Sequence, residues 1–126
     1  MRKIIIKTDE APEAIGPYSQ AVKCKSGLIF TAMQIGLDPA TGVLKGNDIE
    51  SQTRQAFDNL KNILEAAGSG FENVVKSTLY FSDLNNFAKV NELYSEYFTS
   101  DFPARAAVEV TGLPKGALIG IEMVAD

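Results

Sequence analysis

Arg105 is the side chain of this sequence with the clearest capacity to bind an anionic small molecule. It follows Pro103 at the start of an alternating stretch, typical of a half-buried β-strand, that runs to Val110. Proline fixes its own φ and keeps the preceding residue extended, so it suits the entrance to a strand. A guanidinium held by such a strand presents a planar fork of donors that fits a carboxylate or a phosphate. The simpler alternative is a solvated arginine in a surface ion pair, since most arginines lie on the surface.

The chemistry open to this chain is limited by what the sequence lacks. It contains no histidine and one cysteine, Cys24, so a Ser-His-Asp triad, a thiolate zinc site and an intrachain disulfide are all excluded. Neither a GxGxxG pattern nor a P-loop is present. We therefore expect no metal, and any reaction must use carboxylates, arginine, lysine, tyrosine, hydroxyls, backbone amides and water.

Two other polar side chains are candidates because of their sequence context. Tyr18 follows the turn signal Gly16-Pro17, and its ring could line a pocket with the hydroxyl as a polar handle, or plug the edge of the core. Asn91 falls on the apolar stripe of a predicted helix. A buried amide must find hydrogen bonds, and a structural tie to neighbouring backbone is the simpler explanation for it.

Composition favours one ordinary globular domain over residues 1–126. The net charge of −4 offers no basic stripe and argues against nucleic acid as a partner. The apolar run at Ile4-Ile5-Ile6 is too short for a secretion signal, and no run approaches the roughly 20 residues that span a bilayer. With a single cysteine, these features predict a cytoplasmic protein.

The elements that position these residues are predicted in the order β-β-β-α-β-α-β-β. The first helix is expected to begin at an Asn47 N-cap, with Glu50 reaching back to it, and to end at Gly68. The second is expected to run from Ser82 or Asp83 to about Phe98. The predicted strands cover 3–7, 21–24, 28–33, 74–81, about 104–110 and 118–125, with a loop over 34–46.

Two amphipathic helices can cover only one face of a six-stranded mixed sheet, so the predicted fold is α+β. We place Arg105, Ala107, Glu109, Tyr80 and Glu122 on the other face. A sheet face that mixes apolar groups and charges is either wet or covered by another subunit. The sequence therefore predicts a homo-oligomer, with Arg105 and Glu122 on the same face near the rim of its interface, and on adjacent strands if residues 111–117 close a hairpin.

Several blocks of the sequence together resemble the YjgF/RidA family of enamine/imine deaminases. They occur almost end to end and in the family's order: residues 15–20 (IGPYSQ), 34–35 with 38–42, 52–55, 83–88, 102–105 with 108–110 (FPAR, VEV), 113–115 and 121–122. The resemblance implies a chorismate-mutase-like fold and a homotrimer with sites in the clefts between subunits. It implies hydrolysis of 2-aminoacrylate, 2-iminopropanoate and 2-iminobutanoate to 2-oxo acids and ammonia. The intermediates would come from pyridoxal-phosphate enzymes, and the deaminase itself would need no cofactor.

The resemblance also implies roles for individual residues. Arg105 would hold the substrate carboxylate, Glu122 would place or activate the water, Tyr18 would line the pocket, and Asn91 would belong to the supporting polar shell. The chain departs from the family at Ala32 and Met33, where Ser-Gly is usual. Ala32 lacks a hydroxyl that would face the ligand, and the flexible Met33 could fill part of the cleft or swing aside. Ala107 stands where many members have a cysteine that the hydrolysis does not need.

Three functions remain open at the level of sequence. The leading hypothesis is the deaminase. The second is a non-catalytic trimer that binds small carboxylates such as 2-oxo acids through Arg105, an alternative that Ala32 and Met33 favour. The third is an RNA-directed translation inhibitor or endoribonuclease, labels that the family has carried. The acidic balance, the lack of histidine and the lack of interleaved basic and aromatic residues argue against it.

Overall fold

The computed structural model describes residues 2–126, which form seven β-strands and two α-helices joined by loops and short 3₁₀ turns. The strands are β1 (Lys3–Ile6), β2 (Ala21–Cys24), β3 (Ile29–Thr31), β4 (Gln34–Ile35), β5 (Val74–Phe81), β6 (Ala104–Glu109) and β7 (Ile119–Ala125). The helices are α1 (Ile49–Ala66) and α2 (Phe87–Tyr97). No helix of residues 2–126 is both long and apolar enough to cross a membrane.

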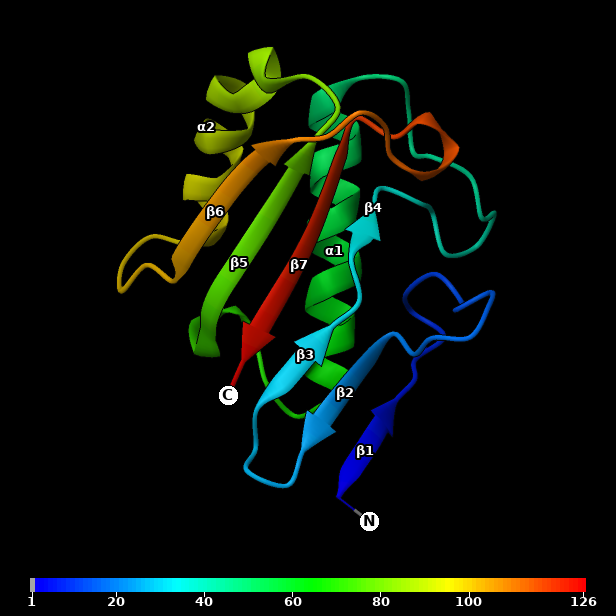
Figure 1. Cartoon of the computed structure of the whole chain (residues 1–126), viewed down its shortest axis with the longest axis vertical. Helices are drawn as coiled ribbons and strands as arrows, with labels where there is room; N and C mark the ends of the chain where they lie inside the picture. Colours follow the sequence, from blue (N-terminus) through cyan, green and yellow to red (C-terminus); the bar gives the residue numbers. More distant parts are fainter. Residues whose placement is uncertain (1) are drawn as a thin grey trace.

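One mixed sheet forms a layer with both helices on the same side of it (Figure 1). Its strand order is β1-β2-β3-β7-β5-β6, and β4 pairs with β7 beyond the end of β3. Only the β5–β6 pair is parallel; the others are antiparallel. The predicted α+β architecture is confirmed. The sheet thus has a helix-covered face, which holds the core, and a helix-free face.

Helix α1 supplies much of the core, and its apolar stripe is buried as predicted. Phe57, Leu60 and Ile63 are fully buried, and Gly68 adopts a left-handed φ of 82° just beyond the helix. The predicted N-cap was wrong by one residue. Asp48, not Asn47, caps the helix by accepting a hydrogen bond of 2.8 Å from the Ser51 N–H, because its charged carboxylate is three residues before that donor.

The predicted third strand, 28–33, is interrupted and continues into the segment predicted as a loop. Phe30 pairs with Val124 and Gln34 pairs with Ile121, so four steps on one strand oppose three on the other. One extra residue is therefore accommodated at Ala32–Met33, as in a β-bulge. The alternation of polar and apolar residues cannot reveal this extra residue. The extra residue moves every later side chain to the opposite face of the sheet.

A similar irregularity occurs at Val75. Simple alternation along β5 would place Val75 on the same buried face as Leu79 and Phe81, but Val75 is 49% exposed. The register of β5 against β7 shifts between Val74 and Lys76, and this shift removes Val75 from the alternation. Ser77 is the residue buried beside Leu79 instead.

The face predicted for one side of β6 was also wrong. Arg105 pairs with Ser77 and Ala107 pairs with Leu79, and both partners are buried under the helices. Arg105, Ala107 and Glu109 therefore lie on the helix-covered side. β6 is the last strand of the sheet, and its more apolar side, which includes the 43% exposed Val108, is the helix-free one. The alternation was therefore assigned to the wrong faces.

Strands β6 and β7 are not neighbours, because β5 lies between them. The hairpin considered for residues 111–117 does not form. In β7, Ile121 is buried beneath the helices while Glu122, which pairs with Thr78, lies on the helix-free face with Tyr80. Arg105 and Glu122 are consequently on opposite faces, which corrects the expectation that they share one.

Helix α2 begins later than predicted. The Asp83 carboxylate accepts from the Asn85 N–H at 2.9 Å and caps a 3₁₀ turn over Leu84–Asn86, after which α2 runs to Tyr97. The expectation that Asn91 is buried was wrong, since the residue is exposed. Asn91 faces the edge strand β6 rather than the core, and its amide oxygen accepts a hydrogen bond from Arg105 there.

Candidate functional site

Arg105 is held in place by three residues of α2. Its Nη1 donates to the Asn91 amide oxygen at 2.8 Å, and its guanidinium carbon lies 4.8 Å from the Tyr94 ring centroid and 5.5 Å from that of Phe87. Contacts of this length with the faces of aromatic rings attract a cation. The ion pairs within residues 2–126 involve Arg54 and lysines and do not include Arg105. The guanidinium is thus oriented, exposed and available to an anion.

The Tyr94 ring beneath Arg105 is itself fixed. Its hydroxyl and that of Ser77 are 2.6 Å apart in a buried hydrogen bond, and Ser77 is the cross-strand partner of Arg105. Burial raises the pKa of Tyr94, so the phenol stays neutral. Sequence reasoning placed Tyr94 in the core stripe and did not connect it with Arg105. The available signal was the spacing of Phe87, Asn91 and Tyr94 on one helical face.

An open groove runs beside this guanidinium. It has a volume of about 450 Å³ and is lined by Asn91, Tyr94, Ser95, Phe102, Pro103 and Arg105. Phe102, the first residue of the FPAR segment, is 65% exposed and adds a large apolar surface to the groove. The groove is therefore at the outer edge of the sheet, where another molecule can approach it.

Glu122 is part of a second group of polar side chains on the helix-free face. The Tyr80 hydroxyl donates to Glu122 Oε1 at 2.6 Å. This hydrogen bond, and secondarily burial, raises the pKa of the Tyr80 phenol, which therefore remains a donor. Sequence reasoning placed both residues on this face but did not predict the bond between them.

Met33 lies against the strand that carries Glu122. A Cβ built on Gly120 would be 2.6 Å from Met33 Sδ, so the thioether occupies the space above that glycine. Gly120 and Glu122 are two apart on β7 and share the helix-free face. The extra residue at Ala32–Met33 thus brings the methionine side chain over β7, next to the position of the carboxylate.

Tyr18, Ala32 and Met33 line one apolar hollow of about 650 Å³. Its other walls come from Ile15, Ile35, Leu37, Pro39 and Pro114, among others. The loop 36–42 is fixed on α1, because a Cβ at Gly36 would meet the Gln52 backbone at 2.5 Å. The Asn59 amide also donates to the Leu37 carbonyl at 2.9 Å. This wall is therefore held before any ligand arrives.

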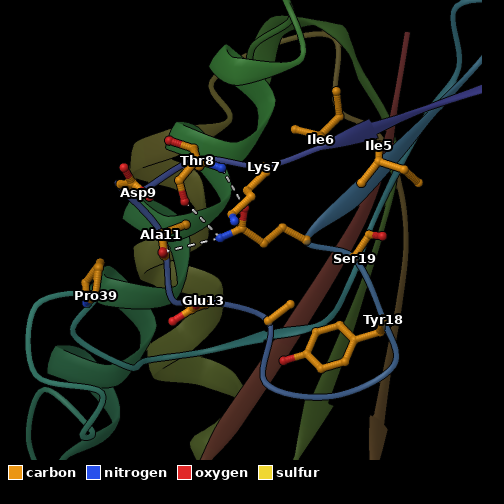
Figure 2. Close-up of a pocket in the computed structure, with 12 residues that line it drawn as sticks. Ile5, Ile6, Lys7, Thr8, Asp9, Ala11, Glu13, Tyr18, Ser19 and Pro39 are labelled. Atoms are coloured by element: carbon orange, nitrogen blue, oxygen red, sulfur yellow. Dashed lines mark hydrogen bonds between the residues drawn. The ribbon is translucent and has the colours of Figure 1, made fainter.

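Tyr18 also borders a neighbouring hollow of about 410 Å³ (Figure 2). Figure 2 shows its ring projecting from the loop that follows Glu13, across from Thr8 and Asp9. The loop is tied down by Gln20, which is 3% exposed. The Gln20 amide donates to the Pro12 carbonyl at 2.8 Å and accepts from the Thr8 N–H at 2.7 Å. Tyr18 itself is 53% exposed.

The predicted site residues thus form two groups in one chain. Arg105 and Asn91 are together at the β6 edge, whereas Tyr18, Ala32 and Met33 surround the apolar hollow, with Glu122 on the adjoining helix-free face. Arg105 and Glu122 are separated by the thickness of the sheet. Within residues 2–126 no group of three or more His, Cys, Asp or Glu side chains is arranged to hold a metal ion.

Comparison with known proteins gives consistent results. A family model described as endoribonuclease L-PSP matches residues 8–126. A RutC family protein of Pyrococcus abyssi is 53% identical over 99% of this chain and 98% of its own. The human 2-iminobutanoate/2-iminopropanoate deaminase is 50% identical over 96% of this chain and 88% of its own. The crystal structure of a Rid family protein from Yersinia pestis superimposes with a TM-score of 0.94 at 48% identity, covering 98% of each chain.

Proposed function

Because the chain belongs to the RidA/YjgF family, we propose that it hydrolyses 2-imino acids and their enamine tautomers to 2-oxo acids and ammonia. The substrates would be 2-aminoacrylate with its tautomer 2-iminopropanoate, and 2-iminobutanoate. The observation that carries this proposal is the geometry of Arg105. Its guanidinium is exposed, and Asn91 and two aromatic rings orient it, which suits bidentate binding of a carboxylate.

In the proposed reaction Arg105 binds the substrate carboxylate and Glu122 acts on water. The water oxygen bonds to the imine carbon, the C=N π electrons move to nitrogen, and Glu122 accepts a water proton. The nitrogen of the resulting carbinolamine takes up a proton and leaves as ammonia. The carbinolamine hydroxyl loses its proton as the C=O bond forms. A protonated imine is already electrophilic, so an anchored substrate and a positioned water suffice without a protein nucleophile.

The proposed site combines two subunits of a homotrimer. Arg105 and Asn91 would come from one protomer, and Glu122, Tyr18, Ala32 and Met33 from its neighbour. The separation of these groups in the single chain supports this arrangement, as does the exposure of Val108 and Phe30 on the helix-free face, 43% and 46%. A closed ring of identical subunits would repeat the same contact at each boundary.

The proposed activity needs no cofactor, since water and the side chains named above supply every step. Its functional partners would be pyridoxal-phosphate enzymes that release 2-aminoacrylate or the imine of 2-oxobutanoate, and its proposed setting is the cytoplasm. The direct test generates 2-aminoacrylate in situ with a serine- or threonine-dehydrating enzyme and follows release of the 2-oxo acid. We expect acceleration above the spontaneous rate, and none from Glu122→Gln prepared in the same way.

Binding without catalysis is the second candidate, and the position of Met33 favours it. The thioether fills the space above Gly120 beside Glu122, where it would compete with a substrate. In that case a 2-oxo acid would bind saturably, Arg105→Ala would abolish the binding, and imine hydrolysis would stay at its spontaneous rate. The RNA-directed candidate rests on the description of the matching family model; incubation with single-stranded RNA at physiological salt would test it, and we expect no cleavage.

A further inference from the structure

The hydrogen bond between Tyr80 and Glu122 has an unusual geometry within the sheet. The direct cross-strand neighbour of Glu122 is Thr78, whereas Tyr80 pairs with Gly120. The Tyr80 hydroxyl therefore reaches Glu122 Oε1 diagonally, at 2.6 Å, a distance within the reach of a long aromatic side chain. Because the residue of β7 opposite Tyr80 is Gly120, no β7 side chain stands directly across from the tyrosine. The bond is thus a specific product of these three positions.

The bond leaves the two oxygens of the carboxylate in different situations. Oε1 accepts from the phenol, while among residues 2–126 the structure gives Oε2 no hydrogen bond, and none from the Thr78 hydroxyl. The last torsion of a glutamate side chain is otherwise broad. A donor on one oxygen restricts that torsion and leaves the other oxygen free to accept from a water.

We propose that Tyr80 is a positioning residue of the hydrolytic site, which holds the Glu122 carboxylate with one oxygen fixed and the other directed at the attacking water. This inference rests on the proposed function. Tyr80 does not touch the substrate in this scheme; it acts through Glu122. If the last torsion of Glu122 were free, the carboxylate would often be misaligned with the water, and the hydrolysis would be slower.

The experiment compares Tyr80→Phe with Thr78→Val, a matched control that removes the other hydroxyl neighbouring Glu122. Both are purified as full chains and assayed on 2-iminopropanoate generated in situ, across a range of pH. We expect Tyr80→Phe to lower kcat about tenfold, the effect of losing one hydrogen bond to a charged group, with KM changed less than about twofold. Thr78→Val should match the wild type.

A double substitution separates positioning from general damage. In the Glu122→Asp background, where a shorter side chain keeps the carboxylate but withdraws it from the phenol, Tyr80→Phe should lower the remaining rate no further, because the tyrosine acts only through that contact. A further drop there, or a Tyr80→Phe enzyme whose kcat equals that of Thr78→Val, overturns the inference while the proposed function stands. If the wild type itself gives no acceleration, the proposed function fails and the positioning role with it. Thermal unfolding of the wild type, the two single variants at positions 80 and 122 and their double variant measures the coupling energy between the two side chains.

Discussion

Arg105 and Glu122 project from opposite faces of one sheet, on strands separated by β5. The aromatic rings of α2 hold the arginine, and Tyr80 holds the glutamate. Within one chain the two side chains therefore point away from each other. We propose that a site using both residues is completed by a second copy of the chain.

The first prediction is that the protein is a trimer. Light scattering at micromolar concentration should give about three times the 13.6 kDa chain mass. Val108→Asp should weaken the assembly, because Val108 is 43% exposed on the helix-free face and a buried unpaired charge is costly. Ala88→Asp, exposed in the first turn of α2, is the matched control and should remain trimeric. A monodisperse monomer of the wild type would contradict both the trimer and the shared site.

The second prediction is that two inactive variants restore each other's activity. Arg105→Ala and Glu122→Gln should each be inactive alone. Unfolded together and refolded as a 1:1 mixture, they should recover about a quarter of wild-type activity, since that fraction of subunit boundaries pairs an intact arginine with an intact glutamate. Mixing the folded trimers without exchange should give nothing. If the refolded mixture also gives nothing although the wild type refolds, each site lies within one chain or elsewhere.

The third prediction concerns Arg105→Lys, which keeps the charge but loses the planar fork and the stacking on Tyr94. If Arg105 grips a carboxylate with two donors, losing one charge-assisted hydrogen bond costs about 1.5–3 kcal/mol, a tenfold to hundredfold drop in kcat/KM. Thermal unfolding should change little, because cation–π contacts of an exposed guanidinium contribute only about 0.5–1 kcal/mol. Full activity in a folded Arg105→Lys trimer would show that the arginine is structural.

The fourth prediction addresses Met33. Ala32→Ser combined with Met33→Gly should clear the space above Gly120, return a hydroxyl, and speed turnover of 2-iminobutanoate, the larger substrate. The added backbone freedom of glycine in the unfolded chain costs about 0.4–1 kcal/mol, so the melting temperature is measured beside the rate. Ala32→Ser alone serves as the control that separates the hydroxyl from the cleared volume. A stable double variant that turns over no faster would show that the thioether does not obstruct the site.

The fifth prediction is that the Asp48 N-cap of α1 stabilises the fold less at acidic pH. The Ser51 N–H lowers the pKa of the Asp48 carboxyl, so this group stabilises the fold above its unfolded-state pKa of about 3.9 and loses that contribution as pH falls through its lower native value. Asp48→Ala should lower Tm at pH 7 by about 4 °C and by less at pH 2.5. Asn47→Ala is the matched control and should change Tm little at either pH. Equal losses from Asp48→Ala at both pH values would contradict a charge-dependent cap.

The sequence alone determined both helices, most of the core and the order of the elements except the short strand β4. Periodicity is a local property, and the apolar stripe through Phe57, Leu60 and Ile63 is long enough to identify this segment as a helix. The sequence also limited the possible chemistry, because the absence of histidine rules out a histidine base or metal ligand whatever the fold. The candidate residues Arg105 and Glu122 also stood out from residue type and their place in recognisable blocks.

Only the tertiary structure decided which face each side chain takes. One extra residue at Ala32–Met33 and a register shift at Val75 reverse the alternation that sequence reasoning assumes. The side of Arg105 was set by its pairing with Ser77 and by the rings of α2, contacts between segments far apart in the chain. The bonds Tyr94–Ser77 and Tyr80–Glu122 have the same origin. Strand register is a cooperative property of the whole sheet, so no local pattern could have supplied it.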